Sequence, residues 1–178
     1  MAKQIRRIVT GHNAAGKSII MQDGMATSIL ELPAAPGLRV TDLWETTTSP
    51  ADLSSDADPT ARPVHLEPAA TGSICRIVEF PPDAVMNKGG DSHKVFDSLG
   101  ASHTRDTSSK TPGMHKTASV DYAIVLSGEV WAVMDEGETL MKAGDVLIQR
   151  GTNHAWSNRS DTSAMIAFIL VGATLPGK

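Results

Sequence analysis

Residues 112–158 read PGMHKTASVDYAIVLSGEVWAVMDEGETLMKAGDVLIQRGTNHAWSN, and this stretch decides the fold. Three short apolar segments, Tyr122–Leu126, Val130–Met134 and Asp145–Ile148, alternate with glycine-bearing turns, which is typical of antiparallel strands joined in hairpins. The turn Asp135–Glu138 reads DEGE, and its glycine tolerates the positive φ that a tight hairpin needs. The stretch therefore predicts an all-β domain.

Three residues of metal-ligating types lie in the same stretch: His115, Asp121 and His154. Alternate residues of a strand share a face, so an uninterrupted strand from His115 would point His115, Thr117 and Asp121 the same way. A later hairpin would bring His154 to them. Two imidazoles and one carboxylate form a three-ligand metal site that leaves positions open for water and a substrate. We therefore predict a metal site made of His115, Asp121 and His154.

Two groups of residues carry a family resemblance. The first group is Gly113, His115, Lys116, Thr117, Asp121 and Gly128, and the second is Gly144, Asp145, Gln149, Gly151, His154 and Asn158. They resemble the two motifs of the cupin superfamily, here at residues 112–128 and 144–158. Thr117 stands where the family has a second histidine, Asp121 replaces its usual glutamate, and Gln149 replaces a common proline. The chain is also similar to a bacterial and fungal subgroup with the pattern His-x-Thr-x-x-x-Asp-Tyr.

The resemblance implies a cupin-type double-stranded β-helix, or jelly-roll, barrel that holds one ligand. Nitrogen and oxygen donors suit one divalent transition metal ion, and Fe, Zn, Mn, Co and Ni are not distinguished by them. Thr117, or a water that it holds, would occupy the position of the missing histidine. Asp121 has an alternative role, in which it orients a histidine instead of binding the metal.

Further residues are candidates for the wall of the ligand pocket. Thr117 would project into the barrel beside His115. Trp131 and Trp156 can supply apolar walls, with packing in the core as the alternative. The planar guanidinium of Arg150 suits a substrate carboxylate, with a surface ion pair as the alternative.

Bulk properties limit the class of protein. A chain of 178 residues suits a single domain, 1–178, with N-terminal strands and a long loop in 1–70 and the barrel core in 71–175. A net charge of −4 gives no reason to expect a nucleic-acid partner. The single cysteine, Cys75, favours a reducing, cytoplasmic location. We find neither a membrane-spanning apolar run nor the apolar core of an export signal.

Residues 11–18 read GHNAAGKS and match the phosphate-binding pattern G-x-x-x-x-G-K-S. That motif functions only where Lys and Ser open a helix whose amides bind phosphate. Here the next residues, IIMQDG, are β-branched and meet a turn, so we predict a hairpin loop between strands Arg6–Thr10 and Lys17–Met21. Exchange of these N-terminal strands across a homodimer would resemble habits of the family.

The remaining segments have simpler interpretations. Val40–Thr47 and Ser73–Phe80 predict strands, and the polar, Pro-rich Ser49–Pro68 predicts a surface connection. Met86–Thr111 is polar and rich in Gly and Ser, so it predicts a long loop, either a lid over the site or a mobile surface loop. The apolar run Ala164–Ala173 predicts a final strand that is buried on both faces or lies in a subunit interface.

Two functions agree with these features. The first is a metal-dependent enzyme acting on a carbonyl- or enol-bearing small molecule, as a lyase, decarboxylase, isomerase or oxygenase. The resemblance to fungal members associated with polyketide pathways points to aromatic or polyketide-like substrates. The second is a non-catalytic module that binds or senses a small ligand in the same pocket, and metal content would help to separate the two.

Overall fold

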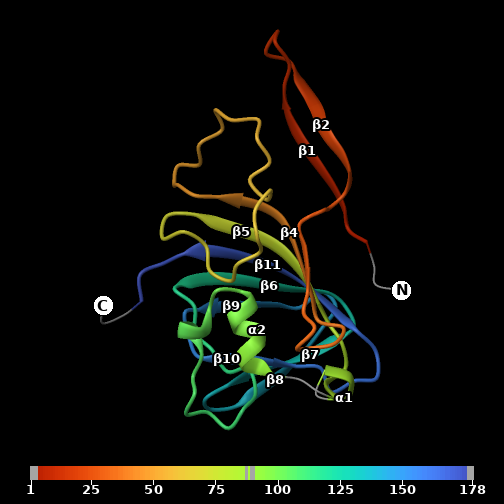
Figure 1. Ribbon diagram of the computed structural model, residues 1–178, viewed down its shortest axis with the longest axis vertical. Coiled ribbons are helices and arrows are strands. Elements are labelled where there is room, and N and C mark those ends of the chain that lie inside the picture. The colour runs from red at the N-terminus through yellow and green to blue at the C-terminus, as the bar shows by residue number, and fades with distance from the viewer. Residues whose placement is uncertain (1–3, 87, 89–90, 176–178) are drawn as a thin grey trace.

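The computed structural model describes residues 4–86, 88 and 91–175, and it is built mainly of β-strands (Figure 1). The strands are β1 (Arg6–His12), β2 (Ser18–Met25), β3 (Ile29–Glu31), β4 (Arg39–Thr46), β5 (Ser73–Phe80), β6 (Ser119–Ser127), β7 (Glu129–Met134), β8 (Glu138–Lys142), β9 (Val146–Arg150), β10 (His154–Ser157) and β11 (Ala164–Gly172). The helical segments are α1 (Asp83–Met86), α2 (Ser92–Ser98) and a 3-10 turn, η1 (Ser102–Thr104).

Two antiparallel sheets form the body of the protein. The larger has the strand order β3-β4-β5-β11-β6-β9, and the smaller has the order β10-β7-β8. One cluster of buried side chains includes Ile74 and Ile166 from the large sheet and Val130 and Met141 from the small sheet. Because both sheets contribute to a single core, they pack face to face, and the predicted all-β fold is confirmed.

The strand β11 lies at the centre of the large sheet. It pairs antiparallel with β5 on one side and with β6 on the other, and Ile166 and Leu170 are buried. A strand with neighbours on both edges and a core on one face needs few polar side chains. This position explains the buried residues of the apolar run, but the strand is not buried on both faces along its whole length, because Val171 is 40% exposed.

The hairpin between β7 and β8 has the predicted turn. The Met134 N–H donates to the carbonyl oxygen of Gly137 at 3.0 Å, and Gly137 has a φ of +87°. A residue with a side chain rarely adopts that φ, so glycine is what allows the chain to reverse here.

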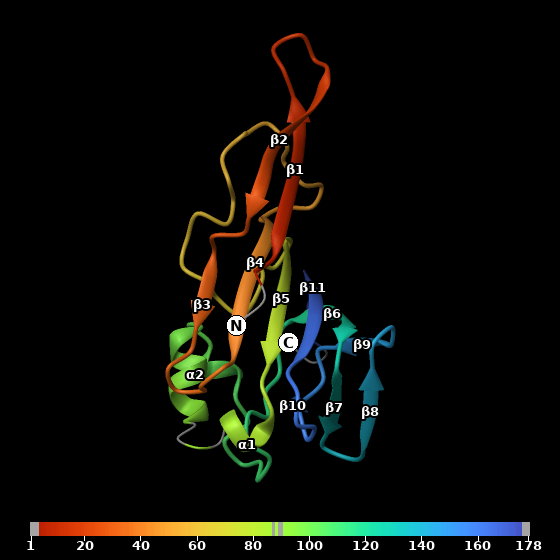
Figure 2. The same cartoon turned by 90° about the vertical axis from the view of Figure 1, so that its right-hand side faces the viewer.

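The strands β1 and β2 form a separate hairpin, which we call the arm, and it extends away from the two sheets (Figures 1 and 2). Its turn lies within residues 11–18, which match the phosphate-binding sequence pattern. The side-chain Oδ1 of Asn13 accepts hydrogen bonds from the Ala15 and Lys17 N–H groups, both at 3.0 Å, so a side chain occupies the amides that would face a phosphate. The turn expected at residues 22–24 does not occur, because β2 continues to Met25.

The segment predicted as a long loop, Met86–Thr111, contains α2 and η1. Its residues Asn87, Gly89 and Gly90 lie outside the described part of the chain. The Asp91 side chain accepts hydrogen bonds from the His93 and Lys94 N–H groups and so caps α2 at its N-terminus. The connection Ser49–Pro68 contains neither helix nor strand, as predicted. No helix in the described ranges is long and apolar enough to cross a membrane.

Candidate functional site

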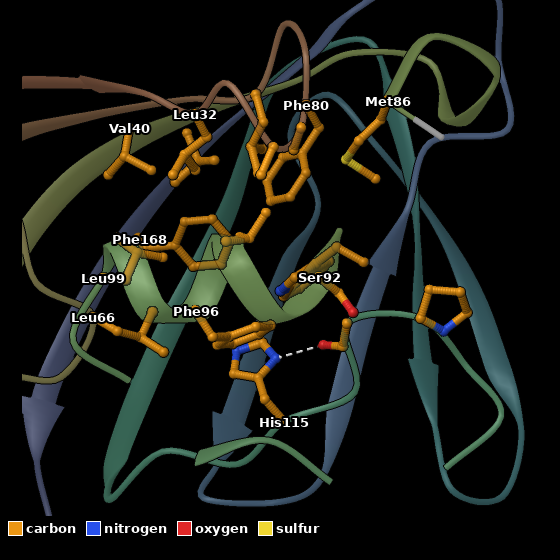
Figure 3. Close-up of a pocket in the computed structure, with 18 of the residues that line it drawn as sticks. Leu32, Val40, Leu66, Phe80, Met86, Ser92, Phe96, Leu99, His115 and Phe168 are labelled. Carbon is orange, nitrogen blue, oxygen red and sulfur yellow. Dashed lines mark hydrogen bonds between the residues drawn. The ribbon is translucent and has the colours of Figure 1, made fainter. Parts of the chain in front are cut away.

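A cavity of about 510 Å³ lies between the inner face of the large sheet and α2 (Figure 3). Its walls are mainly apolar: Leu32, Leu38, Val40, Leu66, Val78, Phe80, Met86, Val95, Phe96, Leu99, Trp156, Phe168 and Leu170. The polar residues that line it are Arg76, Asp91, Ser92, His115, Thr117, Asp121 and His154. A cavity of this size, apolar with a few polar groups, suits a small organic ligand.

His115 and His154 stand side by side at the polar end of this cavity. The N–H of each residue donates to the carbonyl oxygen of the other, both at 2.9 Å, so the two form a narrow antiparallel bridge. Their ring centroids are 4.3 Å apart. The backbone therefore fixes the two imidazoles next to each other.

The hydrogen bonds of the rings determine their tautomers. His115 Nδ1 lies 2.8 Å from the Gly113 carbonyl oxygen, and His154 Nδ1 lies 3.0 Å from that of Thr152. A carbonyl oxygen only accepts, so each Nδ1 carries a proton and donates it. Each neutral ring then keeps a lone pair on Nε2, and no described residue donates to either of these atoms.

Burial keeps both imidazoles neutral. It lowers the pKa of His115, against weaker opposing effects of hydrogen bonds to Gly113 and His154. Burial, followed by the effect of a charge on His115, lowers the pKa of His154 to about 3. At neutral pH the cavity therefore contains two uncharged imidazoles with free acceptor nitrogens.

Aromatic rings enclose the histidine pair. The Phe96 ring of α2 lies 4.9 Å from the His115 ring, and the Trp156 ring lies 5.8 Å from that of His154 in an edge-on arrangement. The Arg105 guanidinium lies 5.9 Å from the Phe96 centroid, and it also donates to His93 Nδ1 on the same helix. Through Phe96, α2 packs against the His115 imidazole.

Asp121 lines the same cavity but does not join the two histidines in a three-residue site. In the described ranges, no group of three His, Cys, Asp or Glu side chains is placed to hold a metal ion. The prediction assumed one strand from residue 115 to residue 125, whereas β6 begins only at Ser119. The chain bends before that point, so His115 pairs with His154 next to the small sheet and Asp121 lies in the large sheet.

The surroundings of Asp121 are unusual for a carboxylate. The residue is 4% exposed, and no described group donates a hydrogen bond to its Oδ1. Burial raises the pKa of Asp121 to about 6, against smaller effects of the Ser119 hydroxyl and the Arg76 charge. The buried Thr117 hydroxyl also lines the cavity and accepts a hydrogen bond of 3.0 Å from Ser119.

Arg76 is a cavity residue that the sequence analysis missed. Its Nε lies 2.9 Å from Asp42 Oδ1, and its Nη2 donates to the His65 carbonyl oxygen at 2.5 Å. Both charged side chains are buried. A signal was present, because Arg76 lies two residues from both Ile74 and Val78 and therefore shares their inward face.

Two residues predicted for the pocket wall lie elsewhere. Trp131 is outside the cavity lining. The Arg159 guanidinium lies over the Trp131 ring, 4.6 Å from the ring centroid. Its neighbours Val130 and Ala132 face the core, so alternation turns Trp131 outward. Arg150 is exposed at the end of β9 for the same reason, next to the buried Gln149. Trp156, by contrast, does line the cavity.

Asn158 connects the end of β10 to β5. Its Nδ2 donates to the carbonyl oxygens of Phe80 and Thr162, at 2.9 and 2.8 Å, and its Oδ1 accepts from Ser160. Asn158 therefore pins the turn that follows β10.

The chain resembles proteins from fungi. It is 35% identical over 167 residues to the phomopsin biosynthesis cluster protein C' of Diaporthe leptostromiformis, a match that covers 88% of this chain and 72% of that protein. It is 28% identical over 178 residues to the cupin-domain-containing oxidoreductase virC of Hypocrea virens, covering 97% of this chain and 71% of that protein.

No family model matches the chain. Among solved structures, the cupin domain of Schizosaccharomyces pombe Cnp3 aligns with a TM-score of 0.45 and 12% identity, over 97% of this chain and 86% of that one. The similarity to the fungal proteins extends over most of both sequences. The chain belongs to the cupin superfamily, and its two packed antiparallel sheets are the jelly-roll fold of that family.

Proposed function

We propose that this protein is an enzyme of small-molecule biosynthesis that moves a proton on a largely apolar, carbonyl- or enol-bearing ligand. The observation that carries the proposal is the neutral pair His115 and His154 at the polar end of the apolar cavity. The names of the similar fungal proteins, a biosynthesis cluster protein and an oxidoreductase, support an enzyme of small-molecule biosynthesis, and the proton transfer is argued from the site alone.

The histidine pair provides the proton acceptor. A free Nε2 takes a proton from a carbon next to the ligand carbonyl, and the electron pair of that C–H bond passes to the oxygen as an enolate. Burial alone disfavours the imidazolium that forms, but the enolate carries the opposite charge and stabilises it. Return of the proton to a different atom of the ligand gives an isomerised product.

A divalent transition metal fits this site only in part. The two free Nε2 atoms would hold the ion, and Thr117 lies in the same cavity, but the described residues supply no third ligand to the pair. A bound ion would supply Lewis-acid chemistry at the ligand oxygen. Elemental analysis of untagged protein beside the His154→Gln variant measures whether the ion is held.

Proton exchange tests the proposal without knowledge of the natural substrate. The protein is incubated in D2O with 1-tetralone, a bicyclic aromatic ketone, and NMR follows the loss of hydrogen next to the carbonyl. We expect exchange well above the buffer rate, and loss of that excess in His115→Gln and His154→Gln. The matched control is His12→Gln, because His12 is exposed in the arm.

The same assay after dialysis against a chelator shows whether the exchange needs a bound metal ion. Unchanged exchange means that protein groups suffice, and exchange restored by added Fe, Zn, Mn, Co or Ni means that the ion takes part. Exchange at the buffer rate both before dialysis and after addition of the metal ions would contradict the proposed enzymatic function. The apolar lining would then favour the second candidate function, a module that binds a small ligand without converting it.

A further inference from the structure

The Oδ1 atom of Asp121 is buried, and no described group donates a hydrogen bond to it. The Ser119 hydroxyl donates to Thr117, and the Arg76 guanidinium pairs with Asp42 and donates to the backbone. An unpaired acceptor in a protein interior is costly, and folded proteins retain few of them. Asp121 is therefore poorly explained by the stability of the fold.

The cavity contains an excess of acceptors. His115 and His154 each present a free Nε2, and the carboxylate-bearing Asp121 lines the same cavity. The cavity walls around them are mostly apolar side chains, which donate nothing. A ligand that binds here must bring its own donors, because otherwise these groups lose water and gain no partner.

We infer that Asp121 is a specificity-determining residue that accepts a hydrogen bond from a hydroxyl group of the ligand. The ligand class is a neutral, hydroxylated ring compound, with its ring system against Phe168 and Leu170 of β11 and its hydroxyl at Asp121. Leu170 is the register partner of Asp121, so the apolar wall begins directly beside the carboxylate. A ligand carboxylate would add a further acceptor and a like charge, and so fits this wall poorly.

This inference rests on the proposed function in one respect, namely that the ligand occupies the same cavity. It assigns a role to a residue of β6 in the large sheet, whereas His154 belongs to β10 of the small sheet. Asp121 selects the compound, whereas His115 and His154 exchange its proton. Binding without turnover can therefore test the inference separately.

The test compares two probes that differ in one group, 6-fluoro-2-naphthol and 2-fluoro-6-methylnaphthalene. Hydroxyl and methyl are close in size, so the pair isolates the hydrogen bond. Fluorine NMR titration at pH 8 measures both dissociation constants. We expect wild-type protein to bind the naphthol at least about tenfold more tightly, the effect of satisfying a buried charged acceptor.

Two variants and a control test whether Asp121 causes the preference for the naphthol. Asp121→Leu removes the acceptor, and we expect it to bind the two probes equally. Asp121→Asn keeps the shape and one neutral acceptor, so it should retain a reduced preference. Asp56→Leu removes an exposed carboxylate far along the sequence and should keep the full preference.

Stability gives a second, independent measurement. Removal of an unpaired buried carboxylate should raise the unfolding midpoint of Asp121→Leu, whereas removal of a structural residue would lower it. Equal binding of both probes by wild-type protein would overturn the inference and leave the proton-transfer proposal intact. Binding of neither probe would overturn the inference, and only the tetralone exchange assay would then decide the proposed function.

Discussion

His115 and His154 are held together by their backbones, because each donates its N–H to the other's carbonyl oxygen at 2.9 Å. Each ring is then oriented by a carbonyl oxygen of its own segment, that of Gly113 or of Thr152. The 4.3 Å separation of the rings therefore needs no ligand to establish it. Such a preformed arrangement lowers the cost of ordering the site when a ligand binds.

The buried histidines make the fold sensitive to acid. The pKa of His154 is about 3 in the folded protein, below the ordinary value near 6.5 of an unfolded chain, so between these values only the unfolded state takes up the proton. The contribution of neutral His154 to the unfolding free energy is fully present above about pH 6.5. It is lost as the pH falls toward 3, by up to about 1.4 kcal/mol per pH unit. After dialysis against a chelator, wild-type protein should lose about 2 kcal/mol more than His154→Gln between pH 7.5 and 5. Urea denaturation measures this, and equal losses would contradict it.

Phe96 anchors α2 over the cavity. It is 6% exposed, packs against His115 and belongs to a small buried cluster with Leu99 and Ala101. We expect Phe96→Ala to lower the unfolding free energy by about 3 kcal/mol, because a large buried ring leaves a void. Leu53→Ala is the control, since Leu53 is 82% exposed and its truncation should change little. A loss below about 1 kcal/mol for Phe96→Ala in urea denaturation would show that α2 is not held by this ring.

The ion pair between Arg76 and Asp42 should behave as a unit. Asp42 is 0% exposed, so Arg76→Met leaves a buried charge whose remaining ion-pair partner among the described residues is Arg62. We expect a loss of about 3–5 kcal/mol for Arg76→Met alone. The double variant Arg76→Met/Asp42→Asn should lose less unfolding free energy than the two single variants lose together, because neither charge of the pair is then left without the other. Strict additivity in thermal or urea unfolding would contradict this coupling.

We expect two copies of the chain to associate through the arm, and exchange of these strands remains a prediction. Three apolar arm residues, Ile8, Ile20 and Met25, are 50%, 58% and 55% exposed. Apolar surface of this kind is stabilised when a second copy covers it. Light scattering after gel filtration should give a dimer for wild-type protein and a monomer for Ile8→Glu/Ile20→Glu. Leu53→Glu, which changes an exposed apolar residue outside the arm, should stay dimeric, and a wild-type monomer would refute the prediction.

Strands were predictable from the sequence, because alternation and glycine turns are local signals. Ser73–Phe80 matches β5 to the residue, and the apolar run at the end of the chain forms β11. Helix α2 was missed because its surroundings are polar and rich in Gly and Ser. A weak signal was present, since Asp91 is a favourable cap and Val95, Phe96 and Leu99 have helical spacing.

The residues of the site were predictable as a group, but their arrangement was not. The motifs pointed to His115, Thr117, Asp121 and His154, and Trp156 was a candidate for the pocket wall; all five line one cavity. The separation of Asp121 from the histidines depends on a bend before Ser119, which no residue pattern announces. Trp131 and Arg150 were placed in the wall without testing which face of each strand turns inward.

The lining of the cavity includes residues from both sheets, and this has a consequence for how such proteins diversify. The imidazoles are attached to the small sheet, whereas Asp121, Phe168 and Leu170 belong to the large one. After gene duplication, one copy can accumulate substitutions along the large sheet and accept a new compound while it inherits the imidazole pair unchanged. A single ancestral chemistry can in this way be distributed among pathways that make different products.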